Sequence, residues 1–277
     1  MKTLKFLLGT LPLTCVLAVS GYAQSFLTNG LVAYYPFNGN ANDASGNGID
    51  GTVSAATLAQ DRFGNTNSAY LFDGISTYIN YGNPPALSFS NAFTLSAWIA
   101  PRAGGGVAQM IGCKEHEYWL AIINGTLGCA ISVPGTDTPF VWAHNDSHVS
   151  IPGGWTQVAV VYSTPTASLF MNGASIASFT IGGPITNSSP GYSTADFRIS
   201  GRQEVQPGPY GLESFSGTID DVRLYNRALS PFEIQQLYAF ESQPDCSLEE
   251  GRQTVVFQSV PRYELPVAGF DGFEHVD

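Results

Sequence analysis

Phe215–Ser230 reads FSGTIDDVRLYNRALS, and this stretch does most to decide the fold. Val222 and Leu224 are two residues apart, so on a β-strand their side chains share one face, whereas Ile219 is out of phase with them. A β-bulge at Asp220-Asp221 would restore the phase, because a bulge inserts one extra residue into one strand. We therefore predict a long strand that is bulged at its two aspartates.

Short strand-like runs fill the chain before this stretch. Phe93–Ile99 and Trp155–Tyr162 alternate large apolar residues with small or polar ones, as a strand with one buried face does. Asn124-Gly125 and Asn172-Gly173 lie between such runs and predict hairpin turns, because both turn positions need positive φ. The predicted strands are 31–37, 51–54, 69–72, 77–81, 93–100, 107–113, 118–123, 127–133, 140–144, 155–162, 168–172, 174–180, 197–201 and 218–225.

One helix is predicted, directly after the last strand. Ser230-Pro231-Phe232-Glu233 has a serine suited to the N-cap, a proline at the first helical position and a glutamate three residues after the cap. Ile234, Leu237 and Tyr238 follow at helical spacing. A short helix of about two turns should therefore close the domain.

Composition and charge agree with an all-β protein and narrow its partners. Charged residues make up 12% of the 277 residues, against about 25% in ordinary globular domains, and there are 30 glycines and 17 prolines. The net charge is −11, which disfavours nucleic acid and anionic membranes because both require basic patches. Neutral sugars and divalent cations are more suitable partners, although acidity also keeps an exported protein soluble.

The two ends of the chain differ from its middle. Residues 1–23 combine two lysines, an apolar stretch too short for a transmembrane helix, and small residues before Gln24. These features predict a signal peptide that is cleaved off. The protein should then be exported to the outside or to the cell surface, without insertion into the membrane. Residues 24–242 form the predicted domain. Residues 243–277 are more charged and poor in turns, and they are a tail or linker of unknown structure.

The cysteines of the exported chain are not predicted to pair, although export makes a Cys113–Cys129 disulfide attractive. The two residues lie on the first and third of three successive predicted strands, so they should flank a middle strand at about 10 Å. A disulfide tolerates a Cα separation of about 7 Å at most. Cys246 lies in the tail and has no evident mate.

Several segments together carry a family resemblance. The opening Gly30–Phe37, the Asn42–Gly48 loop, Tyr70–Gly74, Phe93–Ile99, Phe170–Gly173 and the closing Phe215–Ser230 resemble, in order and spacing, the laminin-G-like jelly-roll family of the concanavalin A-like lectin/glucanase superfamily. The resemblance implies a two-sheet antiparallel jelly-roll sandwich, often with one calcium. It also implies a secreted or surface protein that binds glycans or other proteins.

A structural calcium site is predicted between two distant segments. Loop 42–48 is rich in oxygen ligands and glycines, and calcium takes six to eight oxygens from such groups. With the family resemblance, the predicted ligands are Asp43, Asn47 and Asp220, although either Asp220 or Asp221 could serve. The alternative is that these aspartates pair with an arginine such as Arg62 or Arg223 and that Asp43 shapes an Asx turn.

A carbohydrate-binding face is predicted from polar and aromatic residues that gather at turns. Sugars stack on aromatic rings, while amides, carboxylates and arginines bind their hydroxyls. The candidates are His116 and Tyr118 in a polar turn, Trp142 near another, and Arg202 and Tyr210 on a glycine- and proline-rich loop. Three other tryptophans, Trp98, Trp119 and Trp155, fit a buried position better than a sugar platform.

Catalysis is the least favoured function. Glycoside hydrolysis needs two carboxylates, one of them protonated by its surroundings, and the Glu-x-Asp-x-x-Glu pattern of jelly-roll glucanases is absent. Glu115 and Glu117 have suitable spacing, but we expect a solvated turn that keeps both ionised. The predicted function is a secreted, non-catalytic carbohydrate-binding module. An adhesive protein–protein module is the alternative, and a glycoside hydrolase or polysaccharide lyase comes third.

Overall fold

The computed structural model describes residues 25–133, 141–186, 195–203 and 213–244, and for residues 141–145 it describes the backbone alone. The chain divides into two compact units, Met1–Pro244 and Asp245–Asp277, and every described residue belongs to the first. The predicted signal peptide and nearly all of the predicted tail, including Cys246, lie outside the described residues. No helix in the described ranges is long and apolar enough to cross a membrane.

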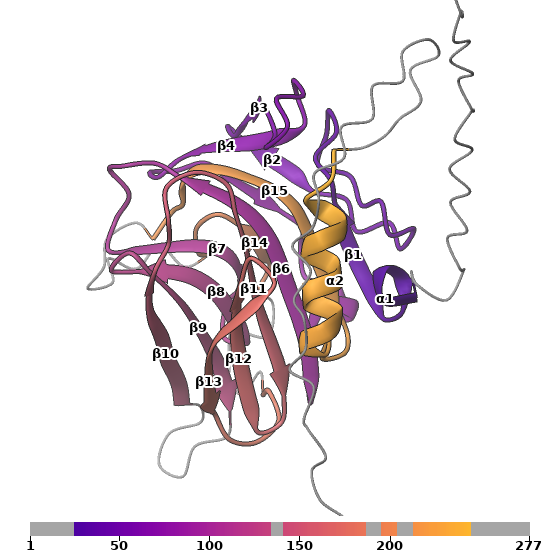
Figure 1. The fold of residues 1–277 in the computed structure, drawn as a ribbon, viewed down its shortest axis with the longest axis vertical. Coiled ribbons are helices and arrows are strands. Elements are labelled where there is room, and N and C mark those ends of the chain that lie inside the picture. The colour runs from indigo at the N-terminus through magenta and orange to yellow at the C-terminus, as the bar shows by residue number, and fades with distance from the viewer. Residues whose placement is uncertain (1–24, 134–140, 187–194, 204–212, 245–277) are drawn as a thin grey trace, which may run out of the picture. The chain divides into compact units, whose positions relative to one another are not determined.

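The described strands form two antiparallel sheets, which confirms the predicted all-β sandwich (Figure 1). The first sheet has eight strands, in the order β13-β12-β11-β6-β15-β4-β3, with β1 also paired to β15. These strands are β1 (Leu31–Tyr35), β3 (Thr57–Ala59), β4 (Ala69–Asp73), β6 (Ala92–Pro101), β11 (Thr156–Ser163), β12 (Thr166–Met171), β13 (Ala174–Thr180) and β15 (Ser216–Tyr225).

The second sheet has seven described strands, in the order β10-β9-β8-β7-β14-β5-β2. These strands are β2 (Thr52–Ser54), β5 (Tyr78–Asn80), β7 (Ala108–Lys114), β8 (Tyr118–Ile123), β9 (Thr126–Val133), β10 (Val141–Ser150) and β14 (Phe197–Ile199). The short helices α1 (Ser25–Thr28) and η1 (Pro85–Leu87) and the longer α2 (Pro231–Glu241) complete the described elements.

All the predicted runs overlap strands, with small differences at their ends. Strand β3 was missed because Thr57–Ala59 is only three residues long and its sequence does not alternate. Strand β10 extends to Ser150, six residues beyond the predicted end at His144. Asn145 and Asp146, which were expected to lie beyond the end of the strand, are therefore part of it.

The main core fills the space between the sheets. Alternate residues of each strand point into it, as β8 shows: Tyr118, Leu120 and Ile122 join this core, whereas Trp119 and Ala121 belong to a smaller cluster on the opposite face of the same sheet. Helix α2 covers the other face of the eight-stranded sheet through Ile234 and Leu237. The outer faces of both sheets are therefore partly apolar.

The predicted β-bulge is present in β15. Ile219 pairs with Ile99 and Asp220 with Trp98, but the register shifts before Arg223, which pairs with Ser96. Asp221 has a φ of 46°, in the left-handed region. The extra residue brings Ile219 into the main core together with Val222 and Leu224. The bulge also turns the two aspartates toward Arg62.

Helix α2 begins as predicted. The Ser230 hydroxyl accepts a hydrogen bond from the N–H of Glu233 at 3.2 Å, and the Glu233 carboxylate accepts one from the N–H of Ser230 at 2.7 Å. Such a capping box satisfies two backbone donors that a helix start leaves free. The helix has eleven residues, one turn more than predicted, because Glu241 at its end is bound by the eight-stranded sheet.

The two described cysteines are free, as predicted. Cys113 pairs across the sheet with Trp119, and Cys129 pairs with Leu120, so β8 separates the two cysteine-bearing strands. Burial raises the pKa of the Cys113 thiol well above its usual range and that of Cys129 to about 12. Both thiols are therefore protonated and inert at neutral pH.

Candidate functional site

The β7–β8 turn, Lys114–Glu117, is buried, and this corrects the expectation of a solvated turn. Glu115 and Glu117 are each only 1% exposed, and His116 is buried with a φ of 63°. Charged residues in a tight turn are usually solvated, but here segments from both earlier and later in the chain cover them. Each glutamate has a basic partner of its own.

Arg202 is the partner of Glu115. Its Nε lies 3.0 Å from both carboxylate oxygens of Glu115, its Nη2 also contacts Glu115, and its Nη1 donates to Glu213 at 3.0 Å. We call these three residues the Arg202 cluster. The two glutamates are almost fully buried, whereas 29% of the Arg202 side chain is exposed. Two buried carboxylates thus hold the N–H groups of a guanidinium whose side chain is partly exposed.

Glu117 points to other partners. Its carboxylate lies 3.5 Å from the Nζ of Lys114 and accepts a hydrogen bond from the Ser88 hydroxyl at 3.1 Å. Glu115 and Glu117 therefore do not face a common space, although their spacing in the sequence allows it. This arrangement differs from the paired carboxylates of glycosidases, which flank a single bond.

The other residues predicted to bind carbohydrate do not lie together. Tyr118 lies in the main core, and its hydroxyl donates to the carbonyl of Leu87 at 2.8 Å, so its assignment to a sugar face is wrong. The backbone of Trp142 pairs with Ser132 on β9. Tyr210 lies outside the described residues. Of the predicted set, the structure joins the His116 turn and Arg202.

The prediction that the remaining three tryptophans are buried holds only in part. Trp98 and Trp119 are 5% and 4% exposed, but both lie on outer faces of the sheets rather than in the main core. Trp155 precedes β11 and is half-buried. Trp119 packs with Met110 and Cys113, next to the Arg202 cluster, because the Cys113 sulfur lies 3.9 Å from the Glu115 carboxylate.

The Asp43 loop is held by its own hydrogen bonds. One carboxylate oxygen of Asp43 accepts from the N–H groups of Tyr34 and Ser45 at 3.0 and 2.8 Å, and the other accepts from the Ser45 hydroxyl and the N–H of Ile49. Burial would raise the pKa of Asp43, but these donors lower it below its ordinary value. The amide of Asn47 donates to the carbonyl of Val32 at 2.9 Å.

Asp220 lies against an arginine. Its carboxylate is 2.8 Å from Nη1 of Arg62, and Nη2 of Arg62 is 2.8 Å from Asp221. A guanidinium in this position repels a metal ion, and both oxygens of Asp43 already have donors. Asp43, Asn47 and Asp220 therefore do not fit the predicted calcium site; they fit the alternative of an Asx turn and an arginine pair. The described residues hold no cluster of three or more histidine, cysteine or acidic side chains suited to a metal.

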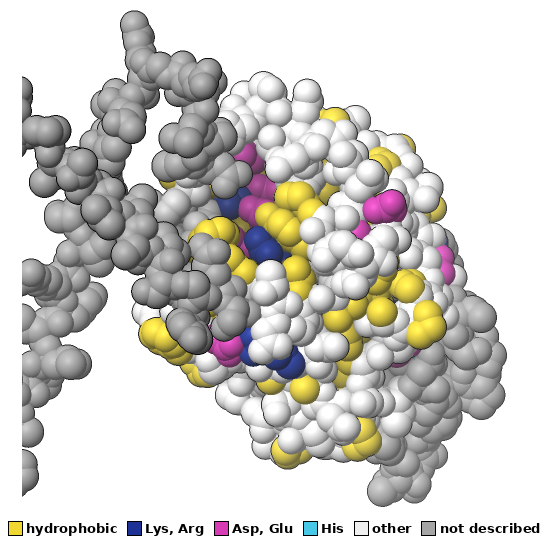
Figure 2. All heavy atoms as spheres, turned by 90° about the vertical axis from the view of Figure 1, so that its right-hand side faces the viewer, with side chains coloured by type: hydrophobic (Ala, Val, Ile, Leu, Met, Phe, Trp, Pro, Cys, Tyr) yellow, Lys and Arg dark blue, Asp and Glu magenta, His cyan; other side chains and the backbone are white. Residues whose placement is uncertain are grey.

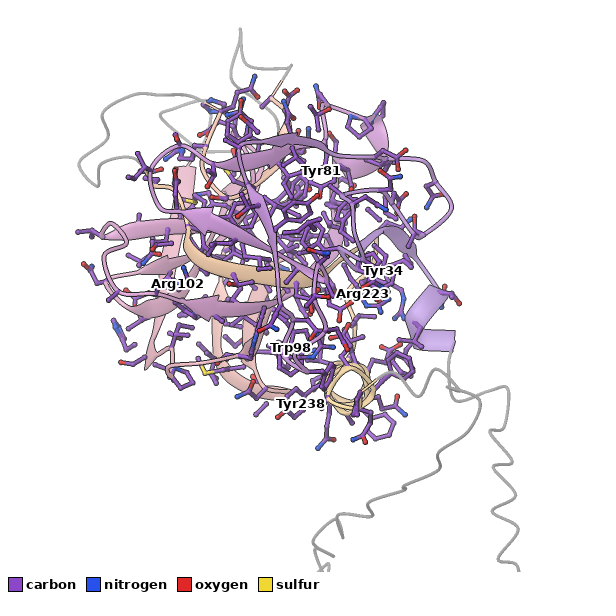
Figure 3. The ribbon with its side chains drawn as sticks, turned by 90° about the horizontal axis from the view of Figure 1, so that it is seen from above. Tyr34, Tyr81, Trp98, Arg102, Arg223 and Tyr238 are labelled. Carbon is purple, nitrogen blue, oxygen red and sulfur yellow. The ribbon has the colours of Figure 1, made fainter. Side chains whose placement is uncertain are left out.

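A buried polar network that sequence reasoning missed lies under α2. Glu241 accepts hydrogen bonds from Arg223 at 2.7 Å, from the Trp98 indole at 2.8 Å and from Gln157 at 3.0 Å. Figure 3 shows Arg223 beside Tyr34, with 3.6 Å from the guanidinium carbon to the ring centre, and Trp98 near Tyr238, which stacks on it. Figure 2 shows acidic and basic side chains close together among hydrophobic ones on the side where α1, β1 and α2 lie in Figure 1.

Part of the chain matches a known family. A laminin-G family model, described as concanavalin A-like lectin/glucanases superfamily, matches residues 73–235. No curated protein matches the chain.

Solved structures share the fold. Domain 4 of AbnA, an extracellular arabinanase from Geobacillus stearothermophilus solved with arabinotriose, is 22% identical with a TM-score of 0.56 over 75% of this chain and 98% of that domain. The binding domain of Paraclostridial Mosquitocidal Protein 1 is 16% identical with a TM-score of 0.62, over 78% of this chain and 53% of that one. A botulinum neurotoxin type C structure, whose description links cell entry to two ganglioside molecules, is 12% identical with a TM-score of 0.57, over 79% and 53%. The chain thus spans about half of the toxin chains.

Proposed function

The chain belongs to the concanavalin A-like lectin/glucanase superfamily, and from this premise we propose that it is an exported, non-catalytic module that binds carbohydrate at the Arg202 cluster. The observation that carries the proposal is the partly exposed side chain of Arg202, whose guanidinium is fixed between Glu115 and Glu213. An arginine has five N–H donors, and the contacts with the two glutamates use only part of them. A rigid, planar donor group of this kind suits adjacent sugar hydroxyls.

The known structures support the class of ligand. The arabinanase domain was solved with an oligosaccharide, and the description of the neurotoxin type C structure names gangliosides. Both ligands are carbohydrates or glycoconjugates, and both proteins share this fold. The acidic charge of the present chain favours neutral glycans over anionic ones.

A glycan array on the secreted protein, followed by calorimetry on the best ligand, tests the proposal. Arg202→Lys keeps the charge but removes the planar fork, so binding should weaken at least about tenfold, which is about 1.4 kcal/mol. Arg102→Lys is the matched control, because Arg102 is exposed and lies outside the cluster. Unchanged affinity in a folded Arg202→Lys protein would contradict the proposed site. Trp142→Ala and His116→Ala test the two other residues predicted from the sequence.

Protein adhesion is a second candidate, favoured by strand β13. Among the described strands β13 pairs only with β12, and its seven residues, Ala174–Thr180, include no charge and no proline. Exposed edges of this kind accept an extended segment of another protein by strand addition. An array without any glycan hit, together with capture of a defined surface protein that a charged substitution in β13 abolishes, would favour this function.

The proposal that the chain is non-catalytic has its own test. The separate partners of Glu115 and Glu117 support it, because a general acid has to reach the leaving group. Turnover of a polysaccharide by the purified protein would overturn it, and loss of that turnover in Glu115→Gln or Glu117→Gln would identify the acid.

Export and calcium complete the proposal. N-terminal sequencing of the protein recovered outside the cell should find cleavage after residue 23. A structural calcium is still proposed from the family resemblance, but its ligands should differ from Asp43, Asn47 and Asp220.

A further inference from the structure

Lys114 has a chemical setting that the proposed function does not use. It is the only lysine after residue 5, yet its side chain is fully buried at the end of β7. Its Nζ contacts the Oδ1 of Asn83, the carbonyl of Ala195 at 2.9 Å and the Glu117 carboxylate at 3.5 Å. An amine, a carboxamide and a carboxyl group therefore meet at one point.

The surroundings favour a neutral amine. The side chains of Lys114 and Glu117 are 0% and 2% exposed, and the neighbouring Tyr118 ring packs against Phe89 and Phe93. Burial lowers the pKa of Lys114, although Glu117 opposes the shift. In a buried site, moving one proton from the ammonium to the carboxylate removes both charges, and burial favours that neutral pair.

We propose that Lys114 and Asn83 become joined by an intramolecular isopeptide bond, with Glu117 transferring the proton. The lone pair of Nζ attacks Cγ of Asn83 and forms a C–N bond. The protonated Glu117 gives its proton to Nδ2 of Asn83 and takes one from Nζ in return. The Cγ–Nδ2 bond then breaks and ammonia leaves. No oxidant or cofactor is required, and the exposed position of Asn83 gives the ammonia a route to solvent.

The bond would join two parts of the seven-stranded sheet that are far apart in the sequence and do not pair directly. Asn83 follows β5, whereas Lys114 ends β7, and β14 lies between these strands. A covalent link there closes a loop and restricts the unfolded chain, as a disulfide does. The competing arrangement is a protonated Lys114 that donates to the same three acceptors without reacting.

Trypsin separates the two arrangements, because it does not cleave after an acylated lysine. An unmodified chain gives peptides 63–102, 103–114 and 115–198. The proposal predicts instead that 103–198 remains uncut and is joined to 63–102, with a mass lower by one ammonia, about 17 Da. Tandem mass spectrometry of the joined species should place the link at Lys114 and Asn83.

Variants identify the groups. Asn83→Ala should give the three linear peptides. Lys114→Met lacks the cleavage site after residue 114, so it should give 63–102 and 103–198 as two separate, unjoined peptides. Glu117→Gln should greatly slow the loss of ammonia. Glu115→Gln is the matched control, because Glu115 binds Arg202 and should leave the cross-link in place. Complete cleavage after Lys114 in the wild-type protein, with no loss of mass, would overturn the proposal whether or not the variants fold.

Discussion

Nε of Arg223, on strand β15, donates to Oε1 of Glu241, the last residue of helix α2, at 2.7 Å. Both side chains are at least 95% buried. The other oxygen of Glu241 accepts from Trp98 and Gln157, so both carboxylate oxygens are used. The end of α2 is therefore fixed to the eight-stranded sheet by polar contacts, while its middle is held by apolar ones.

Removing the Glu241 carboxylate should be strongly destabilising. Glu241→Ala leaves the Arg223 guanidinium buried without its carboxylate, and breaking a buried pair in this way costs about 3–5 kcal/mol. Urea unfolding followed by tryptophan fluorescence measures the loss. Gln235→Ala, at an exposed position of the same helix, is the control and should change stability by less than about 0.5 kcal/mol. A loss below about 1 kcal/mol in Glu241→Ala would mean that Arg223 finds water or another partner.

Stability should fall as the pH rises through the neutral range. Burial and the charge of Asp221 raise the pKa of Asp220 to about 9, against the opposing effect of Arg62. An acid whose folded pKa is raised keeps a proton that the unfolded chain has lost, so its contribution is fully present below about pH 4 and is lost between about pH 4 and 9. Glu241, whose pKa burial also raises, contributes with the same sign.

Asp220→Asn should therefore flatten the dependence of unfolding free energy on pH between about 5 and 9. One proton contributes a slope of at most about 1.4 kcal/mol per pH unit. Asp50→Asn, which changes an exposed carboxylate, should keep the wild-type profile. If the profile of Asp220→Asn stays parallel to that of the wild type, Arg62 holds Asp220 ionised throughout.

Reducing agents should not change the stability of the exported protein through Cys113 or Cys129. Both are free and buried, and burial raises the pKa of both thiols. In a Cys246→Ser protein without its signal peptide, a thiol reagent should react slowly in buffer and with two thiols in denaturant. A midpoint of unfolding that falls on addition of dithiothreitol would indicate a disulfide and a different register of β7, β8 and β9.

The sequence was sufficient to predict features set by residues close together in the chain. The alternation of Phe93–Ile99, the phase error at Ile219 and the Ser230–Glu233 capping box each depend on fewer than ten residues. The structure agrees with these three predictions, because local periodicity and local hydrogen bonding determine the strand, the bulge and the start of the helix. The hairpin turns at Asn124 and Asn172 were predictable for the same reason.

The partners of the charged residues could not be predicted in this way. Lys114–Glu117 has the composition of a solvated turn, and nothing within the turn shows that Asn83, Ala195 and Arg202 will cover it. Arg62 and Glu241 are likewise joined across most of the chain. One signal was available: Lys114 is the only lysine after the predicted signal peptide, which is unusual for a merely solvated position.

Chelation should separate the proposed calcium from the three residues first predicted to bind it. Calcium at a hundredfold excess over its dissociation constant should raise the stability of the native protein by about 2.7 kcal/mol, and excess EDTA should remove that gain in a thermal unfolding scan. Because the Asp220 carboxylate faces Arg62, Asp220→Asn should respond to calcium and EDTA as the wild type does. A calcium response that is present in the wild type and absent from Asp220→Asn, with magnesium inactive, would show that Arg62 moves aside and that calcium binds at the Asp43 loop after all. An unchanged midpoint in the wild type would remove calcium from the proposed function.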